Sequence, residues 1–88
     1  MEMKRILIDR MTENLPVLRK KLKLSQAALA ECVGTSRHTV MQMENKKRPM
    51  TWSTFLSLVL VFEKNEETAR LMRALEIYTD ELDGMLCR

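Results

Sequence analysis

The sequence predicts an all-α fold, a compact bundle of five helices, or of six if a short N-terminal helix precedes them. Two glycines and two prolines in 88 residues leave few tight turns. Leucine and methionine, which favour helices, are used heavily, and apolar residues recur at spacings of three and four. The composition, 45% hydrophobic and 31% charged, is typical of globular proteins. We therefore expect residues 1–88 to form a single domain.

The N-terminal part predicts two helices. Apolar spacing indicates a short helix over about residues 4–12. Asn14 can cap a second helix that runs to about Lys23. Pro16 would then fall in the first turn of that helix, where a missing N–H is tolerated.

The next two expected helices are joined by a very short connection. Ser25 can cap a helix over residues 26–33, and Gly34 can end it because glycine adopts a positive φ without steric cost. Ser36 can cap a following helix over residues 37–45. Only two residues separate the first of these helices from the second cap, so the helices must turn sharply on each other. This arrangement is a helix-turn-helix.

A further helix is expected from a cap at Thr51 to Phe62. Its apolar residues recur at three and four, with Ser57 on the opposite side, which favours a helix over a strand. The apolar arc is unusually wide and extends to Leu60, so we expect more than one neighbouring helix to cover it.

The last helix is expected over residues 66–83, with Asn65 as its cap and Gly84 at its end. A narrow apolar stripe at spacings of four and three predicts a homodimer interface on it. The stripe consists of Leu71, Leu75, Tyr78, Leu82 and Met85. The alternative is that the stripe packs within the chain.

Charge is divided unevenly along the chain. Residues 1–48 hold 11 Lys and Arg against 5 Asp and Glu, a balance of +6, whereas residues 49–88 hold 4 against 7, a balance of −3. A basic region attracts a polyanion through counterion release, and an acidic region is repelled by it and suits contact with protein. Ordinary solvated surface is the alternative interpretation.

The helix expected over residues 37–45 has one apolar and one polar face. At 100° per residue, Val40 and Met43 share an arc with Glu44. The other arc holds Arg37, His38, Met41, Gln42 and Asn45. Arg and Gln side chains match the hydrogen-bonding groups of base edges, guanine for Arg and adenine for Gln. The polar face is therefore typical of a recognition helix.

A series of short motifs lies at fixed offsets through residues 15–62. It comprises Leu24-Ser25-Gln26, Leu29-Ala30, Gly34, the Thr-Ser-Arg-His-Thr-Val run at 35–40, Glu44-Asn45 and Arg48-Pro49. In this register the chain resembles the phage repressor and Cro-type helix-turn-helix family of DNA-binding regulators. The resemblance implies a helix-turn-helix core over residues 14–62 and sequence-specific binding of double-stranded DNA by a small transcriptional regulator, a repressor for example.

The resemblance also implies roles for individual residues. Base contacts are expected from Arg37, His38 and Gln42. Contacts to the DNA backbone are implied for Gln26 and Asn45 and are also expected from Ser36 and Thr39. Independently of the resemblance, the basic residues are expected to flank the groove and meet phosphates: Lys20, Lys21 and Lys23 on one side, and Lys46, Lys47 and Arg48 after the recognition helix. Arg19 and Glu44 match a structural ion pair of the family, the alternative being two solvated charges.

Lys46 departs from the family pattern, which commonly has glycine after Glu44-Asn45. Either the lysine adopts the helix-ending conformation at some cost, or the helix closes differently.

Other functions are less well supported. No nucleophile, base and orienting acid stand at motif spacing, so we expect no enzyme and no cofactor. His38 is the only histidine, and Cys32 and Cys87 are 55 positions apart, so no metal site is expected. Two such cysteines do not make a disulfide framework either. The lack of such a framework favours a reducing, cytoplasmic location. The longest uncharged stretch, 14 residues over 49–62, is shorter than the roughly 20 that span a membrane.

A second hypothesis assigns the chain to a different class. It would be an antitoxin-like module that holds a partner protein, with DNA contact secondary. A copurifying second polypeptide would separate this hypothesis from a stand-alone regulator.

Overall fold

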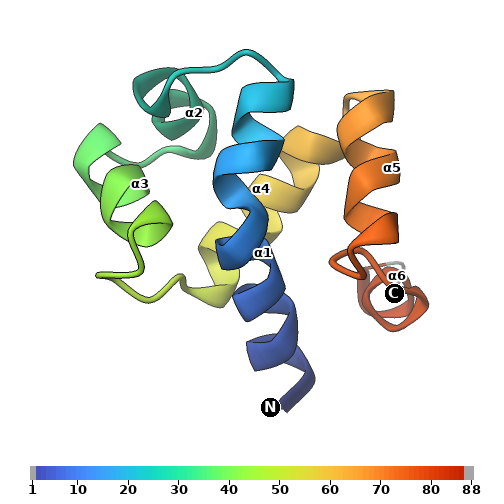
Figure 1. Ribbon diagram of the computed structural model, residues 1–88. Helices are drawn as coiled ribbons and strands as arrows, with labels where there is room; N and C mark the ends of the chain where they lie inside the picture. The colour runs from blue at the N-terminus through green and yellow to red at the C-terminus, as the bar shows by residue number, and fades with distance from the viewer. Residues whose placement is uncertain (1, 87–88) are drawn as a thin grey trace.

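The computed structural model describes residues 2–86, and these residues form six α-helices and no strand (Figure 1). The all-α prediction is confirmed. The helices are α1 (Glu2–Lys21), α2 (Gln26–Val33), α3 (Arg37–Glu44), α4 (Trp52–Glu63), α5 (Glu66–Ala74) and α6 (Asp80–Leu86).

Two helices form the middle of the molecule. In Figure 1, α1 lies in front of α4, α2 and α3 lie to the left of them, and α5 and α6 lie to the right. Both α1 and α4 contact elements on each side, and α2 packs against α3. The buried side chains of α1 and α4 provide the centre of one core: Leu7, Met11, Leu15 and Leu18 from α1, and Phe55, Leu58, Val59 and Phe62 from α4. Residues from all six helices or their connections join this core.

The two helices predicted at the N-terminus are a single helix. Asn14 is not a cap, and its side-chain amide donates instead to the carbonyl of Arg10 at 2.8 Å. Pro16 lies inside α1. The four buried side chains of α1 recur at four, four and three, so one continuous helix buries all of them. This burial outweighs the backbone hydrogen bond that a proline removes.

The helix predicted over residues 66–83 is interrupted. α5 ends at Ala74, and Glu76 in the connection has a left-handed φ of 60°. α6 begins at Asp80, and Gly84, the predicted end, lies within α6. The predictions of a continuous helix and of its end at Gly84 were therefore wrong.

The interruption brings two apolar side chains into the core. Ile77 and Leu82 are both fully buried. The backbone N–H groups of Ile77 and Tyr78 donate to the carbonyl of Met72 at 2.8 and 3.1 Å, which closes the end of α5. The gain from burying the two side chains favours the turn over one more stretch of helix.

The predicted dimer stripe is consequently not the surface of one helix. Leu82 is buried within the chain, and Leu71, Leu75 and Tyr78 are partly buried against the same core. Met85 lies on α6, partly exposed. Most side chains of the stripe therefore pack at least partly against the core of their own chain, as the alternative stated.

The apolar arc of α4 is centred differently from the prediction. Phe55, Leu58, Val59 and Phe62 face the core, whereas the side chain of Leu60 is 67% exposed. The helices α1, α2 and α5 pack against α4. The expectation that several neighbours cover this helix is confirmed, and the expectation that Leu60 is covered is wrong.

The predicted N-caps other than Asn14 are confirmed. The hydroxyls of Ser25, Ser36 and Thr51 each accept a hydrogen bond from the backbone N–H three residues later. Asn65 accepts from two backbone N–H groups of α5. These bonds satisfy N–H groups that have no partner within the helix, so the starts of α2 to α5 follow from local chemistry.

Several helix ends use the left-handed conformation. Gly34 has φ 75°, and three other residues share this region although they carry a side chain: Lys23 at 59°, Lys46 at 62° and Glu76 at 60°. A side chain in this region crowds the following carbonyl, so these positions hold strain that glycine would avoid.

We predict that Lys23→Gly raises the free energy of unfolding by about 0.5 to 1 kcal/mol, because relief of left-handed strain exceeds the added entropy of the unfolded chain. Among the described residues, the Lys23 side chain has no hydrogen-bond or ion-pair partner to lose. Urea unfolding followed by circular dichroism measures the change. Gly34→Ala is the matched control, since a Cβ there meets nothing within 4 Å, and it should lower stability by about 1 kcal/mol. A destabilised Lys23→Gly protein would contradict the assigned conformation.

Candidate nucleic-acid interface

The connection between α2 and α3 is built for a sharp turn. Gly34 caps α2 in the left-handed conformation, and the N–H groups of Gly34 and Thr35 both donate to the carbonyl of Ala30. Ser36 then begins α3 by accepting from the N–H of Thr39 at 3.1 Å. Ala30 and Val40 are buried in the common core. The small side chain of Ala30 allows the two helices to approach closely. The helix-turn-helix predicted from the sequence is present.

The two faces of α3 are divided as predicted. Val40 and Met43 are buried in the core. The opposite face presents Arg37, His38 and Asn45 as exposed side chains and Met41 and Gln42 as partly exposed ones. All three predicted base-contacting residues therefore lie on one solvent-facing surface.

Arg19 and Glu44 form the predicted ion pair. The Nε of Arg19 donates to Oε2 of Glu44 at 2.7 Å, and Nη2 donates to Oε1 at 3.2 Å. Only 12% of the arginine side chain and 6% of the glutamate side chain are exposed. Nη1 of Arg19 also donates to the carbonyl of Leu24 at 3.0 Å, so the same side chain joins the end of α1 to the connection before α2 as well as to α3.

Gln26 joins this cluster, which the sequence did not predict. Its Nε2 donates to Oε1 of Glu44 at 3.0 Å. One N–H of the amide expected to hold a phosphate is therefore committed to Glu44 within the protein. The two residues lie on separate helices, and spacing along the chain carried no signal of the bond. As a result, α1, α2 and α3 meet at one buried carboxylate.

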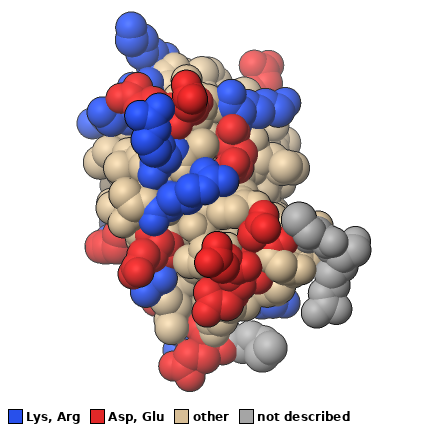
Figure 2. Space-filling model, turned by 90° about the vertical axis from the view of Figure 1, so that its right-hand side faces the viewer, with Lys and Arg blue, Asp and Glu red and all other residues tan. Residues whose placement is uncertain are grey.

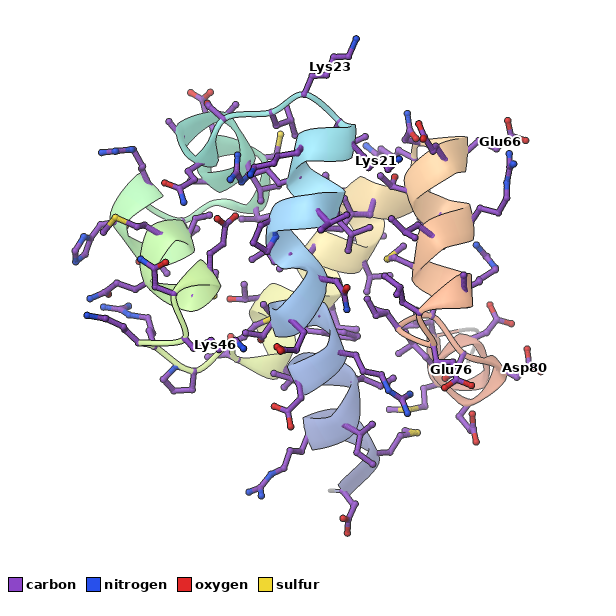
Figure 3. The ribbon with its side chains drawn as sticks, viewed as in Figure 1. Lys21, Lys23, Lys46, Glu66, Glu76 and Asp80 are labelled. Atoms are coloured by element: carbon purple, nitrogen blue, oxygen red, sulfur yellow. The ribbon has the colours of Figure 1, made fainter. Side chains whose placement is uncertain are left out.

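Lys46 adopts the helix-ending conformation, the first of the two alternatives raised by its departure from the family pattern. Its φ is 62°, its N–H donates to the carbonyl of Met43, and the next N–H, of Lys47, donates to that of Gln42. The Lys46 ammonium group bonds both carboxylate oxygens of Glu13 at 2.6 and 2.9 Å. Figure 3 shows the side chain directed to α1. Lys46 therefore braces the end of α3 against α1.

Arg48 folds back to α3. Its Nε donates to Oε1 of Gln42 at 3.1 Å. From the sequence, Arg48 was expected at the DNA backbone and Gln42 at the bases. The structure makes them a bonded pair.

The cations near the helix-turn-helix fall into two groups. Lys21 pairs with Glu67 of α5 at 3.1 Å, and Lys46 pairs with Glu13. Within residues 2–86, the exposed cations without an acidic partner include Lys20, Lys23, Arg37 and Lys47. Figure 3 shows Lys23 projecting into solvent and Lys21 turned to α5. The predicted flank of α1 thus contributes less free positive charge than its sequence indicates.

Negative charge gathers on the side of the molecule away from α3. Figure 2, which views the α5 and α6 side, shows a cluster of Asp and Glu side chains over its lower part and a mixture of Lys, Arg, Asp and Glu side chains above it. An open depression of about 550 Å³ there is lined by four acidic side chains, those of Glu76, Asp80, Glu81 and Asp83, and by one cation, Arg73. Glu76 and Asp80 lie at the far side from α3 in Figure 3. A cluster of acidic side chains from the C-terminal half of the chain therefore lies on the side of the molecule away from α3.

Ser36 and Thr39 lie at the start of the exposed face of α3, and their hydroxyls bond each other at 2.9 Å.

In the part of the chain that the structure describes, no three His, Cys, Asp or Glu side chains form a group that could hold a metal ion. No helix of the same part is long and apolar enough to cross a membrane. Comparisons with protein-family models, curated proteins and solved structures find no match to this chain.

We predict that Glu44→Ala lowers the free energy of unfolding by about 3 kcal/mol, because it leaves the Arg19 charge buried without its partner. Urea denaturation measures the loss. The double variant Arg19→Met/Glu44→Leu replaces the pair with apolar side chains of similar size and should recover most of it. If the double variant is as unstable as Glu44→Ala, the unpaired charge of Arg19 is not the cause of the lost stability.

Proposed function

We propose that the protein binds double-stranded DNA sequence-specifically, as a small transcriptional regulator, with α3 in the major groove. The observation that carries the proposal is the solvent-facing surface of α3, where Arg37, His38 and Gln42 lie together on a helix whose other face is buried. An α-helix with its side chains is about 10 to 12 Å across and fits the major groove, which is about 12 Å wide. Base edges are within reach of side chains on such a helix.

The charge distribution supports one orientation on the duplex. Lys47 and Arg48 lie three and four residues beyond the end of α3 and are exposed, so they are placed to meet phosphates at the edge of the groove. The acidic α6 lies on the other side of the molecule. Approach with α3 foremost brings positive charge to the phosphates and holds negative charge away from them.

In this proposal, the contacts that hold α3 against α1 and α2 contribute to the sequence specificity of DNA binding. The Arg19 and Glu44 pair, with Gln26, joins α3 to both preceding helices. A helix held in this way keeps its side chains in register with the bases, as discrimination between base pairs requires.

We also propose that two copies bind one site. A single recognition helix contacts only a few base pairs, and two copies with their α3 helices about 34 Å apart would cover adjacent half-sites on one side of the duplex. Sedimentation equilibrium of the complex should give two chains per duplex. One chain per duplex would contradict this part of the proposal.

Binding to duplex DNA should weaken steeply with salt. If about four cations of each copy meet phosphates, the logarithm of the association constant should fall with the logarithm of salt concentration at a slope of about −3.5 per copy. Fluorescence anisotropy across a salt series measures the slope. Glu13→Gln frees Lys46 from its carboxylate and should steepen the slope by about one. A response independent of salt would exclude the proposed surface.

Arg37→Ala and Lys47→Ala each remove one exposed positive charge but should act differently. Loss of a base contact at Arg37 should reduce the ratio of specific to nonspecific affinity by about 5- to 150-fold, the equivalent of 1 to 3 kcal/mol. Lys47→Ala should weaken both kinds of binding by a similar factor, since phosphates are common to all sequences. Titrations with a selected site and with random-sequence DNA give the ratio. Equal effects of the two substitutions on it would contradict the placement of α3.

A further inference from the structure

We infer that Arg48 determines which base Gln42 binds. The base of the DNA site that Gln42 contacts is then preferentially guanine and not adenine. The inference rests on the proposed function, because it needs α3 in the major groove. It assigns Arg48 a role in specificity, beyond the phosphate contact expected from its place in a basic run.

The geometry brings Arg48 back to α3. Lys46 takes the left-handed conformation, and the N–H of Lys47 donates to the carbonyl of Gln42 at 2.8 Å, which reverses the chain at the end of the helix. Arg48 then places its Nε 3.1 Å from Oε1 of Gln42. Because the helix end itself aligns the two residues, their contact follows from the backbone as well as from the side chains.

The chemistry of the pair fixes the orientation of the Gln42 amide. A guanidinium group has donors and no acceptor, so only the oxygen of the amide can face it. The amide nitrogen is left to meet other partners. Gln42 therefore offers two N–H donors to the groove, and Arg48 keeps further N–H donors on its terminal nitrogens.

Guanine fits this set of donors better than adenine does. Guanine presents two acceptors in the major groove, N7 and O6, whereas adenine presents the acceptor N7 and the amino donor N6. A free glutamine binds adenine through both ends of its amide, with its oxygen on N6. Here that oxygen accepts from Arg48, and the positive guanidinium group stands where the adenine amino group would have to approach. The negative O6 of guanine is instead attracted.

The pair is solvent-accessible in the free protein, where water competes with the hydrogen bond. In the groove water is largely excluded, and a charge-assisted bond becomes stronger in a medium of lower dielectric constant. The orientation of Gln42 is thus reinforced at the moment when it contacts a base.

The test is selection of bound sites from a random duplex pool with the full chain and four variants. Gln42→Ala identifies the position at issue, as the one whose base preference it abolishes. The unmodified protein should select guanine there. Arg48→Ala should shift the adenine-to-guanine ratio toward adenine by about 5- to 150-fold, the range of one bidentate contact. Arg48→Met, which keeps much of the side-chain stem without the donor, should give the same shift.

Lys47→Ala is the matched control, because it removes an exposed positive charge from the neighbouring residue. It should weaken binding and leave the base preference at this position unchanged. Circular dichroism of each variant confirms that it is folded.

Three results would overturn the inference: selection of adenine by the unmodified protein, an unchanged ratio in both Arg48 variants, or no position that depends on Gln42. In each of them a sequence preference elsewhere in the site would leave the proposed function standing. Enrichment of no sequence at all would overturn the proposed function together with the inference.

Discussion

The ion pair between Arg19 and Glu44 is the interaction on which the position of α3 depends. Its two bonds, with those to the Leu24 carbonyl and from Gln26, join three helices at one nearly buried carboxylate. The desolvation of two charges is costly, so the net gain in stability over apolar packing is small. The directional character of the bonds is the more important property, because a bidentate pair accepts only a narrow range of helix orientations.

A helix as short as α3 requires such support. Eight residues do not form a stable helix in water, so α3 exists because the rest of the chain holds it. Its side chains Val40 and Met43 are buried, its start is capped by Ser36, and its end is braced by the bond from Lys46 to Glu13. The face left to solvent then consists of side chains that the fold does not need. This is the physical basis for assigning them to a partner.

Internal pairing of charges also shapes the proposed surface. Lys21 and Lys46 are each paired with a glutamate from another element, and Gln26 and Gln42 are each bonded to a charged side chain. Such contacts reduce the general attraction for phosphates and orient the groups that remain. A moderate number of free cations with well-placed amides favours discrimination between sequences over tight binding to any duplex.

The sequence alone determined the features whose causes are local. The all-helical fold, the caps at Ser25, Ser36, Thr51 and Asn65, the turn at Gly34 and the two faces of α3 each depend on residues within a few positions of one another. The pair of Arg19 with Glu44 was also predicted, but from the resemblance to a family and not from any local signal. The helix boundaries predicted from single residues, Asn14 with Pro16 near the N-terminus and Gly84 near the C-terminus, were wrong. Pro16 does not begin a helix, because continuous burial along α1 outweighs the lost hydrogen bond, and α5 ends early because Ile77 and Leu82 gain burial in the core.

Only the tertiary structure decided the contacts of Gln26, Gln42 and Lys46 with their partners. Each joins side chains from different helices or from either side of a turn, so its geometry exists only after the helices have packed. Helix starts are set by hydrogen bonds that the neighbouring residues can satisfy. Which donors remain free on a binding surface depends on every group that folding brings within reach, and that information is not local.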